Sequence, residues 1–267
     1  MKEILKTAKT MEYAFLFHNE SHEQTFFENH KNEVLQTEGA ILFIEYQAKR
    51  IVVYPAFNDK NALKRSLGGL YPLLGKNETI YIEMGESHKN EGILESIHNT
   101  FIDLGCVLVS ENLAMRLKKI SIKRPFITDN VKKFNSDTKA LYNLSNDLLS
   151  RELFNMTFEE FEAMLNSDEY IILTIEDSED IKGFIYGQIY NDGKSLFLRG
   201  LGVHESFQGM GLSKKLIQGL FEHANQKGIK DSMLWVDAMN HKAIKLYKQF
   251  DYRFDGDKER LYTYRVR

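Results

Sequence analysis

One stretch in the C-terminal half constrains the fold more than any other part of the sequence, because it joins an apolar segment to an amphipathic helix through two glycines. Residues 195–203 are mostly apolar and follow a turn pair at 192–193, which predicts a buried or half-buried strand. Apolar residues then recur at three- and four-residue steps over 212–224, which predicts a helix that ends at a Lys-Gly pair, 227–228. The loop at 208–211 leaves backbone N–H groups unpaired at the helix start, so we expect it to bind an anion such as phosphate.

Length and charge leave room for two domains and argue against nucleic acid as the main partner. The 267 residues allow one large domain or two of ordinary size. The 35 basic and 38 acidic residues give a net charge of -3, and no long run carries one sign. This balance does not favour a nucleic-acid-binding surface.

Cysteine content and hydropathy indicate the compartment. Cys106 is the only cysteine, which excludes an internal disulfide and a cysteine-based zinc site and fits a reducing environment. The first residues lack the apolar core of a signal peptide, and no window approaches the roughly 18 consecutive apolar residues of a membrane-spanning helix. We expect a soluble, cytoplasmic protein with no membrane partner.

The first half of the chain predicts a unit of mixed strands and helices. Two apolar runs around a short polar break, 40–46 and 51–54, have the pattern of a β-hairpin. The other predicted elements are helices at 61–74 and 93–104, a strand at 79–84, and a closing antiparallel pair at 106–109 and 113–117. Residues 118–135 contain a proline and several lysines and are the best linker candidate.

The second half shows the same kind of organisation. Thr157 and Glu160 have the spacing of a capping box, which predicts a helix at 157–165. The other predicted elements are helices at 141–149 and 241–250, strands at 170–175, 182–190, 195–203 and 232–236, and a closing pair at 252–254 and 260–266. The expected fold class is α+β with α/β/α layers, in which each half has a mixed, mainly antiparallel sheet flanked by helices.

An internal repeat favours a division into two tandem units. Residues 101–117 run parallel to 247–266, and Phe101 falls opposite Tyr247. The repeat is low in identity, so the alternative that any strand, helix and hairpin would look alike stays open. We predict one domain over 1–120 and a second over 121–267, of which only the second contains the glycine loop.

Residues 201–213, Leu-Gly-Val-His-Glu-Ser-Phe-Gln-Gly-Met-Gly-Leu-Ser, resemble the acetyl-CoA site of the GNAT N-acetyltransferase family, whose loop reads Gln/Arg-x-x-Gly-x-Gly/Ala. Residues 240–252 resemble the second signature of that family, Asn-x-x-Ala-x-x-Leu-Tyr followed by Gly-Phe. Two positions depart from the pattern. Ser213 stands where the family has Gly or Ala, and Asp251-Tyr252 replaces the Gly-Phe pair. Both changes are expected to preserve cofactor binding, because serine is small and Asp251 lies in a turn after the helix.

The resemblance implies a tandem chain with a degenerate first domain and a catalytic second domain that binds acetyl-CoA. It implies an N-acetyltransferase in which a primary amine, of a small molecule or a peptide, attacks the thioester directly in a ternary complex of a monomer or homodimer. Tyr247 would then face the thioester sulfur and donate a proton to the leaving thiolate. The implied cofactor-binding positions are Leu201, Gly202 and Val203 for the pantetheine arm, Gln208, Gly209, Met210, Gly211, Leu212 and Ser213 for the pyrophosphate, and Asn240 and Ala243 of the second signature.

Several alternatives stay open. Tyr247 could be a core aromatic residue on an amphipathic helix, and the chain could be a non-catalytic acyl-CoA-binding or interaction module. The general base is not identified by sequence, and the candidates are Asp237, Glu176 and His204. The identity of the acceptor amine also stays open.

Two further patterns are weaker. His18 and His22 have a spacing compatible with a metal ion, but no third ligand is evident, so no metal site is expected. Residues 68–77 have an imperfect P-loop spacing. A Rossmann-type site is disfavoured because residues 208–211 lack the three-glycine spacing.

Overall fold

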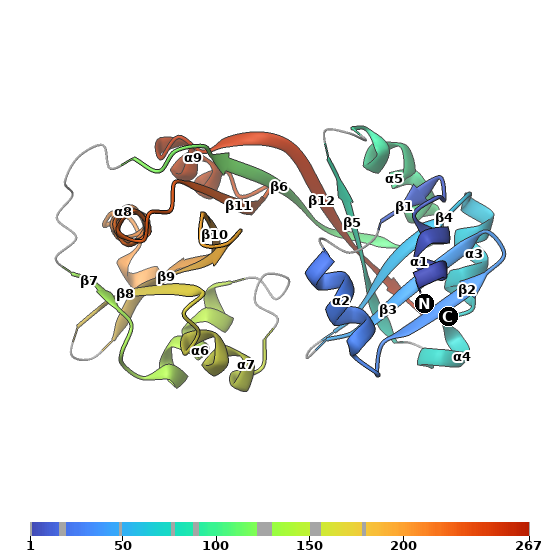
Figure 1. Cartoon of the computed structure of the whole chain (residues 1–267), viewed down its shortest axis with the longest axis horizontal. Coiled ribbons are helices and arrows are strands. Elements are labelled where there is room, and N and C mark those ends of the chain that lie inside the picture. The colour runs from blue at the N-terminus through green and yellow to red at the C-terminus, as the bar shows by residue number, and fades with distance from the viewer. Residues whose placement is uncertain are drawn as a thin grey trace. The chain divides into compact units, whose positions relative to one another are not determined.

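The computed structural model describes residues 2–15, 20–47, 50–75, 78–87, 91–121, 130–149, 156–177 and 180–266 (Figure 1). Two compact units are present, and each contains more than one segment of the chain. The first comprises Met1–Leu113, Asp237–Met239 and Gly256–Arg267, and the second comprises Ala114–Val236 and Asn240–Asp255. A single cut between residues 120 and 121 therefore does not separate these compact units, because the chain returns to the first unit at its end.

The first unit has a sheet in the order β2-β3-β4-β5-β12-β6, with β1 added to β4. The strands are β1 (Tyr13–Ala14), β2 (Glu33–Thr37), β3 (Ala40–Tyr46), β4 (Ile51–Phe57), β5 (Thr79–Glu86), β6 (Val107–Leu117) and β12 (Arg253–Arg265). The helices are α1 (Lys2–Ala8), α2 (Glu20–Glu28), α3 (Lys60–Gly68), α4 (Tyr71–Leu74) and α5 (Ile93–Asp103). The β3–β4 hairpin is confirmed. The helix predicted at 61–74 is instead two helices, because the chain turns at Gly69.

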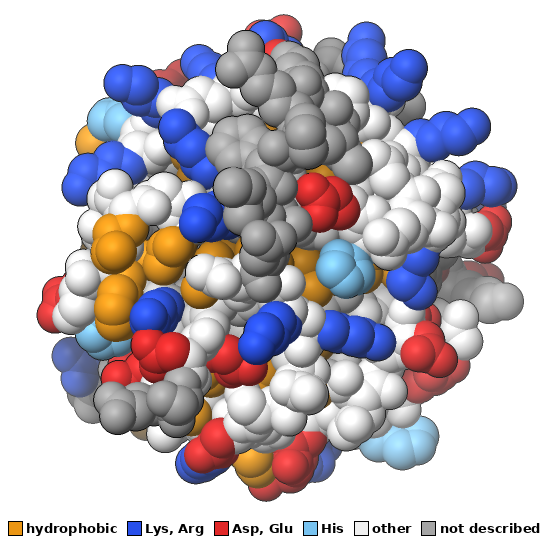
Figure 2. All heavy atoms as spheres, turned by 90° about the vertical axis from the view of Figure 1, so that its left-hand side faces the viewer, with side chains coloured by type: hydrophobic (Ala, Val, Ile, Leu, Met, Phe, Trp, Pro, Cys, Tyr) orange, Lys and Arg blue, Asp and Glu red, His pale blue; other side chains and the backbone are white. Residues whose placement is uncertain are grey.

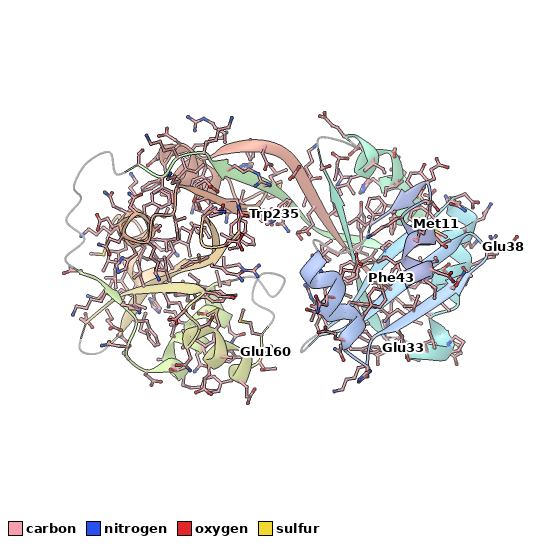
Figure 3. The ribbon with its side chains drawn as sticks, in the orientation of Figure 1. Met11, Glu33, Glu38, Phe43, Glu160 and Trp235 are labelled. Atoms are coloured by element: carbon pink, nitrogen blue, oxygen red, sulfur yellow. The ribbon has the colours of Figure 1, made fainter. Side chains whose placement is uncertain are left out.

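Helices cover both faces of this first sheet, so β3 and β4 are almost entirely buried. On one face, Leu42 and Val53 belong to a cluster with side chains of α3 and α5. On the other face, Phe43 and Tyr54 belong to a cluster with side chains of α1 and α2; Figure 3 shows Phe43 on the sheet. Burial of both faces explains why these strands are runs of apolar residues rather than alternating patterns.

The second unit has a sheet in the order β12-β6-β11-β10-β9-β8-β7. Its remaining strands are β7 (Val131–Lys133), β8 (Tyr170–Glu176), β9 (Ile181–Tyr190), β10 (Ser195–Val203) and β11 (Asp231–Asp237). Its helices are α6 (Thr138–Leu148), α7 (Phe158–Leu165), α8 (Leu212–Gln226), α9 (His241–Gln249) and the short 3-10 helix η1 (Glu205–Phe207). The predicted helices and strands of this unit are confirmed up to α9. Of the predicted linker, residues 122–129 lie outside the described residues.

The helices of the second unit also form layers on its sheet. Phe161 of α7 and Leu141 of α6 are buried in one cluster with Phe184 and Tyr186 of β9. A Cβ atom at Gly187 of β9 would come within 2.8 Å of Leu220, so the glycine lets α8 pack close to the strand. Figure 2 shows one face of this unit, on which acidic and basic side chains both lie.

The closing hairpins predicted for both halves are wrong, because each is one continuous strand. Residues 110–112, read as a turn, stay extended inside β6, and β12 runs without a break from Arg253 to Arg265. In the first unit, β12 pairs antiparallel with β5, from Lys258 opposite Glu86 to Arg265 opposite Thr79. In the second unit, β6 is the strand beside β11. Each unit thus receives its strand from the other half of the sequence, which we call strand exchange.

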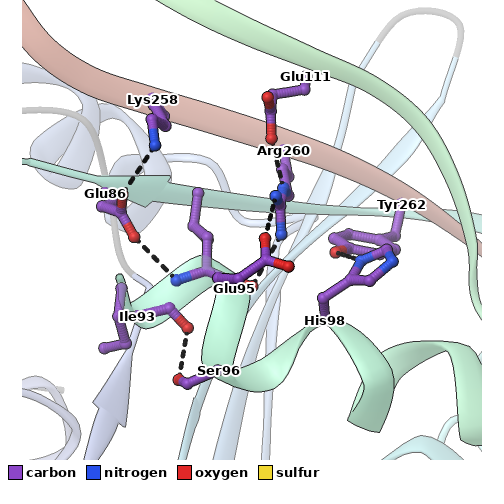
Figure 4. A network of polar contacts seen from close by, with 10 residues as sticks. Glu86, Ile93, Glu95, Ser96, His98, Glu111, Lys258, Arg260 and Tyr262 are labelled. Carbon is purple, nitrogen blue, oxygen red and sulfur yellow. Dashed lines mark hydrogen bonds and ion pairs between the residues drawn. The ribbon is translucent and has the colours of Figure 1, made fainter. Parts of the chain in front are cut away.

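A network of polar contacts anchors β12 in the first unit (Figure 4). Arg260 donates from Nε to Glu111 of β6 at 2.6 Å, from Nη2 to Glu95 of α5 at 2.8 Å, and from Nη1 to the Leu94 carbonyl at 2.9 Å. The Tyr262 hydroxyl and Nδ1 of His98 are 2.7 Å apart. The guanidinium therefore joins three elements, and the carboxylates of Glu95 and Glu111 raise the pKa of Arg260.

The predicted capping box at the start of α7 is confirmed. The Thr157 hydroxyl accepts from the Glu160 N–H at 3.2 Å, and the Glu160 carboxylate accepts from the Thr157 N–H at 2.7 Å. We expect Thr157→Ala to lower the free energy of unfolding by about 1 kcal/mol, because the cap is lost while no core side chain changes. Urea denaturation followed by circular dichroism measures this effect. Thr7→Ala, which removes an exposed hydroxyl bonded only to the Glu3 carbonyl of α1, is the control and should cost less.

Candidate active site

Strands β10 and β11 part midway in the second unit. They run parallel and pair at three positions, from Ser195 opposite Asp231 to Phe197 opposite Met233. Beyond Phe197, β10 continues to Val203 and pairs with β9 on its other edge. Among the described residues, no strand partner meets the β11 side of this last part of β10. An open strand edge can pair with an extended ligand that carries amide groups.

The paired side of β10 is shaped by a close approach to β9. The register shifts between Leu198 and Gly200, as in a β-bulge, which redirects the end of the strand. A Cβ atom at Gly202 would lie 2.5 Å from Cζ of Phe184, the residue opposite it. Gly202 thus lets the Phe184 ring lie against the backbone of β10. Phe184 is a site residue that no sequence motif indicates, and only its place in the strand at 182–190 could have suggested it.

The loop after β10 is held by its own side chains. The Gln208 amide donates to the Val203 carbonyl at 3.2 Å. Nδ1 of His204 accepts from the Ser206 N–H at 3.3 Å and so closes the first turn of η1. The Gln208 contact ties the start of the glycine turn to the end of the strand, a role for this side chain that the loop motif does not indicate.

Two glycines turn the chain into α8. Gly209 and Gly211 have φ values of 80° and 78°, and a Cβ atom at either position would meet nothing within 4 Å. Gly211 is the N-cap of α8, and no side chain caps this helix start. The first N–H groups, including those of Leu212 and Ser213, therefore have no acceptor among the described residues. Because a helix start carries about half a positive charge, this turn suits a phosphate group.

The second signature forms the start of α9, directly after β11. Oδ1 of Asn240 accepts from the Ala243 N–H at 3.0 Å, which is an N-cap contact. This bond explains the three-residue spacing between the two predicted positions. The Asn240 side chain is exposed, so its amide nitrogen can still donate to a ligand. Asp251, which replaces the family's glycine, has a φ of 66° after α9, the conformation that glycine favours.

Tyr247 lies on the buried side of α9, with 8% of its surface exposed. Its ring lies edge-on to Tyr252, with centroids 5.9 Å apart. The Tyr252 hydroxyl is bonded to Ser232 Oγ at 2.7 Å, whereas the Tyr247 hydroxyl has no hydrogen bond to a described residue. Burial raises the pKa of Tyr247 to about 12. The phenol is therefore protonated at neutral pH and can donate a proton to a ligand.

The structure brings the loop and the second signature to one edge of the sheet. Because β10 and β11 are parallel, the turn at 208–213 and Asn240 both follow the carboxyl ends of their strands. Ligands of open α/β sheets bind outside such strand ends. The open edge of β10, the uncapped start of α8 and the second signature on α9 together form the candidate active site.

The candidate bases have local partners. The Glu176 carboxylate accepts from the Ser136 hydroxyl at 2.7 Å and lies two strands from β10, which corresponds to about 10 Å. The Asp237 carboxylate accepts from the Met239 N–H at 2.7 Å. His204 is occupied at Nδ1 by the bond described above. None of these contacts singles out a base.

The two weaker sequence patterns lie partly outside the described residues. His22 interacts through Nε2 with Glu45 at 3.2 Å, and His18 lies outside the described residues. No group of three or more His, Cys, Asp or Glu side chains in the described ranges could hold a metal ion. Residues 68–75 end α3 and form α4, and 76–77 are not described. No helix in the described part of the chain is long and apolar enough to cross a membrane.

Comparison with protein families supports the resemblance. Residues 138–252, which include both signatures, match the model of the acetyltransferase (GNAT) family. The chain is 32% identical over 87 residues to a mycothiol acetyltransferase of Saccharopolyspora erythraea. The match spans 32% of this chain and 28% of that relative. The family-model match thus falls almost entirely within the second unit, and the match to this relative covers less than a third of its length.

Two solved structures share the fold over most of the chain. A tandem GNAT protein from the clavulanic acid biosynthesis pathway matches with a TM-score of 0.59 at 9% identity, over 86% of this chain and 79% of its own. A GCN5-related N-acetyltransferase from Sphaerobacter thermophilus matches with a TM-score of 0.58 at 18% identity, over 86% of this chain and 77% of its own. At such identities the likeness shows the fold, and the fold is that of a tandem GNAT protein.

Proposed function

The C-terminal half of this chain is a domain of the GNAT acetyltransferase family, and from this premise we propose that the protein transfers an acetyl group from acetyl-CoA to a primary amine. One observation carries the proposal: the end of β10, which among the described residues has no strand partner on its β11 side, lies next to the start of α8, which no side chain caps. The pantetheine arm of CoA is an extended chain with amide groups, and its pyrophosphate is an anion. The two features match these two parts of one ligand.

The residues would divide the work as follows. The backbone from Leu201 to Val203 would pair with the pantetheine arm, and the N–H groups of 209–213 would hold the pyrophosphate. Bound acetyl-CoA would supply the thioester that the amine attacks. A backbone N–H near Val203 would stabilise the negative charge that develops on the carbonyl oxygen. As the C–S bond breaks, Tyr247 would give its phenolic proton to the leaving sulfur, and the new C–N bond completes the amide.

Release of free CoA thiol tests the proposal. The intact protein is incubated with acetyl-CoA and a panel of polyamines, amino acids, aminoglycosides and lysine-containing peptides, with no amine in the control. We expect thiol release that depends on one class of amine. Binding of CoA without turnover on any class would instead indicate a non-catalytic acyl-CoA-binding module.

Gly211→Ala should weaken CoA binding by at least 10-fold. The added methyl group would stand where the backbone meets the pyrophosphate, and alanine strains a left-handed turn by about 1–2 kcal/mol. Gly92→Ala is the matched control, because Gly92 is also a left-handed N-cap glycine, with a φ of 88° and open space around it, but lies in the first unit. Isothermal titration with CoA should give the wild-type affinity for Gly92→Ala. Equal losses in both variants would show that strain, and not the site, causes the effect.

A further inference from the structure

The first unit contains the same strand arrangement as the candidate active site, but protein groups fill it. We propose that residues 13–15 and Asp59 permanently occupy the positions in the first unit that correspond to the pantetheine arm and the pyrophosphate, so that the chain binds one CoA. The number of bound CoA molecules rests on the function proposed above. The filling of the first unit does not.

The two units have equivalent strands. In the first, β4 and β5 run parallel and pair at three positions, from Ile51 opposite Ile80 to Val53 opposite Ile82. β10 and β11 also pair in parallel at three positions before they part. Helices follow in the same order, with α3 after β4 and α5 after β5, as α8 follows β10 and α9 follows β11. The last part of β4 therefore corresponds to the open part of β10.

In the first unit, β1 takes this edge. Ala14 lies opposite Ala56, and Tyr13 lies opposite Phe57. The Phe15 N–H donates to the Pro55 carbonyl at 2.9 Å. Because β3 pairs with the other edge of β4 along its whole length, β1 must lie on the edge that β5 has left. The N-terminal segment is thus added as a short antiparallel strand where an extended ligand would bind.

Pro55 makes this edge a poorer partner for an amide ligand. Its carbonyl faces β1, and the N and C=O groups of one strand residue point to the same side. Proline has no N–H, so the edge lacks one donor that β10 retains at all its positions. The fit with β1 needs no such donor, because the bond there runs from Phe15 to Pro55.

Aromatic packing fixes β1 in place. Phe15 is 3% exposed, and the rings of Tyr13 and Phe57 are stacked with centroids 5.0 Å apart. The ring of Phe57 in turn lies against that of Phe101 of α5, with centroids 6.2 Å apart. Phe101 is the counterpart of Tyr247 in the repeat. The first unit therefore has an apolar aromatic cluster where the second has a tyrosine hydroxyl without a hydrogen-bond partner among the described residues.

Asp59 fills the position at the start of α3 that corresponds to the pyrophosphate position at the start of α8. Its carboxylate accepts from the N–H groups of Asn61 and Ala62 at 2.7 and 2.9 Å and caps α3. The start of α8 has no such cap. A carboxylate bound at the start of α3 satisfies the donors that a phosphate would need, and its charge repels a second anion.

A pair of cysteines tests the position of β1. In the full chain, Ala14→Cys with Ala56→Cys places thiols on opposite residues, and the control pairs Ala14→Cys with Ala40→Cys. Ala40 is as buried as Ala56 but lies on β3, on the far side of β4, beyond the ~7 Å that a disulfide spans. Free thiols per chain are counted under denaturing conditions before and after mild oxidation. Each double variant has three thiols when reduced, because Cys106 is the only native cysteine. We expect oxidation to remove two thiols in the first variant and none in the control. Free thiols in both would overturn the proposal.

The same variants report whether a cofactor displaces β1. Titration calorimetry with CoA should give one site per chain in the wild type and in the crosslinked variant, with affinities within about two-fold. Two sites in the wild type and one after crosslinking would overturn the proposal, because β1 would then be displaced by ligand. If no form binds CoA, the failure belongs to the proposed function of the second unit, and the thiol count still decides the position of β1.

Discussion

Replacing Tyr247 by phenylalanine should lower turnover by about 10²- to 10⁴-fold and leave CoA affinity nearly unchanged. The reason is that the phenol is buried, protonated and bonded to no described residue, so its hydroxyl is free to act on the leaving sulfur. Steady-state kinetics with the best amine of the panel and calorimetry with CoA measure the two effects separately.

Tyr252→Phe is the control for the loss of a hydroxyl. This hydroxyl is bonded to Ser232 inside the protein, so its removal should lower the free energy of unfolding by about 1 kcal/mol and change turnover little. Tyr247→Phe should have the reverse pattern, with unchanged stability. A fall in turnover of less than about five-fold for Tyr247→Phe would leave Tyr247 as a core aromatic residue and remove it from the proposed mechanism.

Deleting residues 256–267 should unfold the first unit, although these residues lie at the opposite end of the sequence. The segment supplies Tyr262, Tyr264 and Val266, which are 0%, 8% and 1% exposed in the first core. At about 1.5–3 kcal/mol for each buried side chain, their loss rivals the 5–15 kcal/mol that stabilises an ordinary domain. Limited proteolysis should cleave the truncated chain within residues 1–113 and spare the second unit.

Two fragments make this prediction specific. Residues 1–120 alone should not unfold cooperatively, because β5 has lost its neighbour β12. The same fragment with residues 256–267 joined to its end by a flexible linker should regain a cooperative transition. Cooperative unfolding of residues 1–120 without the added strand would show that strand exchange does not determine the stability of the first unit.

The second unit follows from its sequence because its signals are local. The helical spacing of α8, the capping box of α7 and the three-residue spacing of Asn240 and Ala243 each depend on neighbours within a few turns. The glycine loop is also readable, because a left-handed turn before a helix restricts the residue type at Gly211.

The strand exchange does not follow from local patterns. Residues 110–112 resemble a turn in composition, but they stay extended because β6 is hydrogen-bonded between distant strands. Nothing near Tyr262 in the sequence indicates that it packs beside His98, 164 positions away. The two-residue strand β1 is also beyond a periodicity argument, because alternation needs at least four residues to be visible.

The order of synthesis gives the strand exchange a consequence in the cell. A ribosome that adds about 5–20 residues per second needs roughly 7–30 s to travel from the end of β6 to the end of β12. During that time the nascent first unit presents β5 without its neighbour, and an unpaired strand edge attracts other chains. The second unit gains all its strand residues, including the start of β12, before the first is complete. Translation therefore completes the first unit after the second, and a ribosome that stops before residue 256 releases a chain in which the damaged part is the first unit.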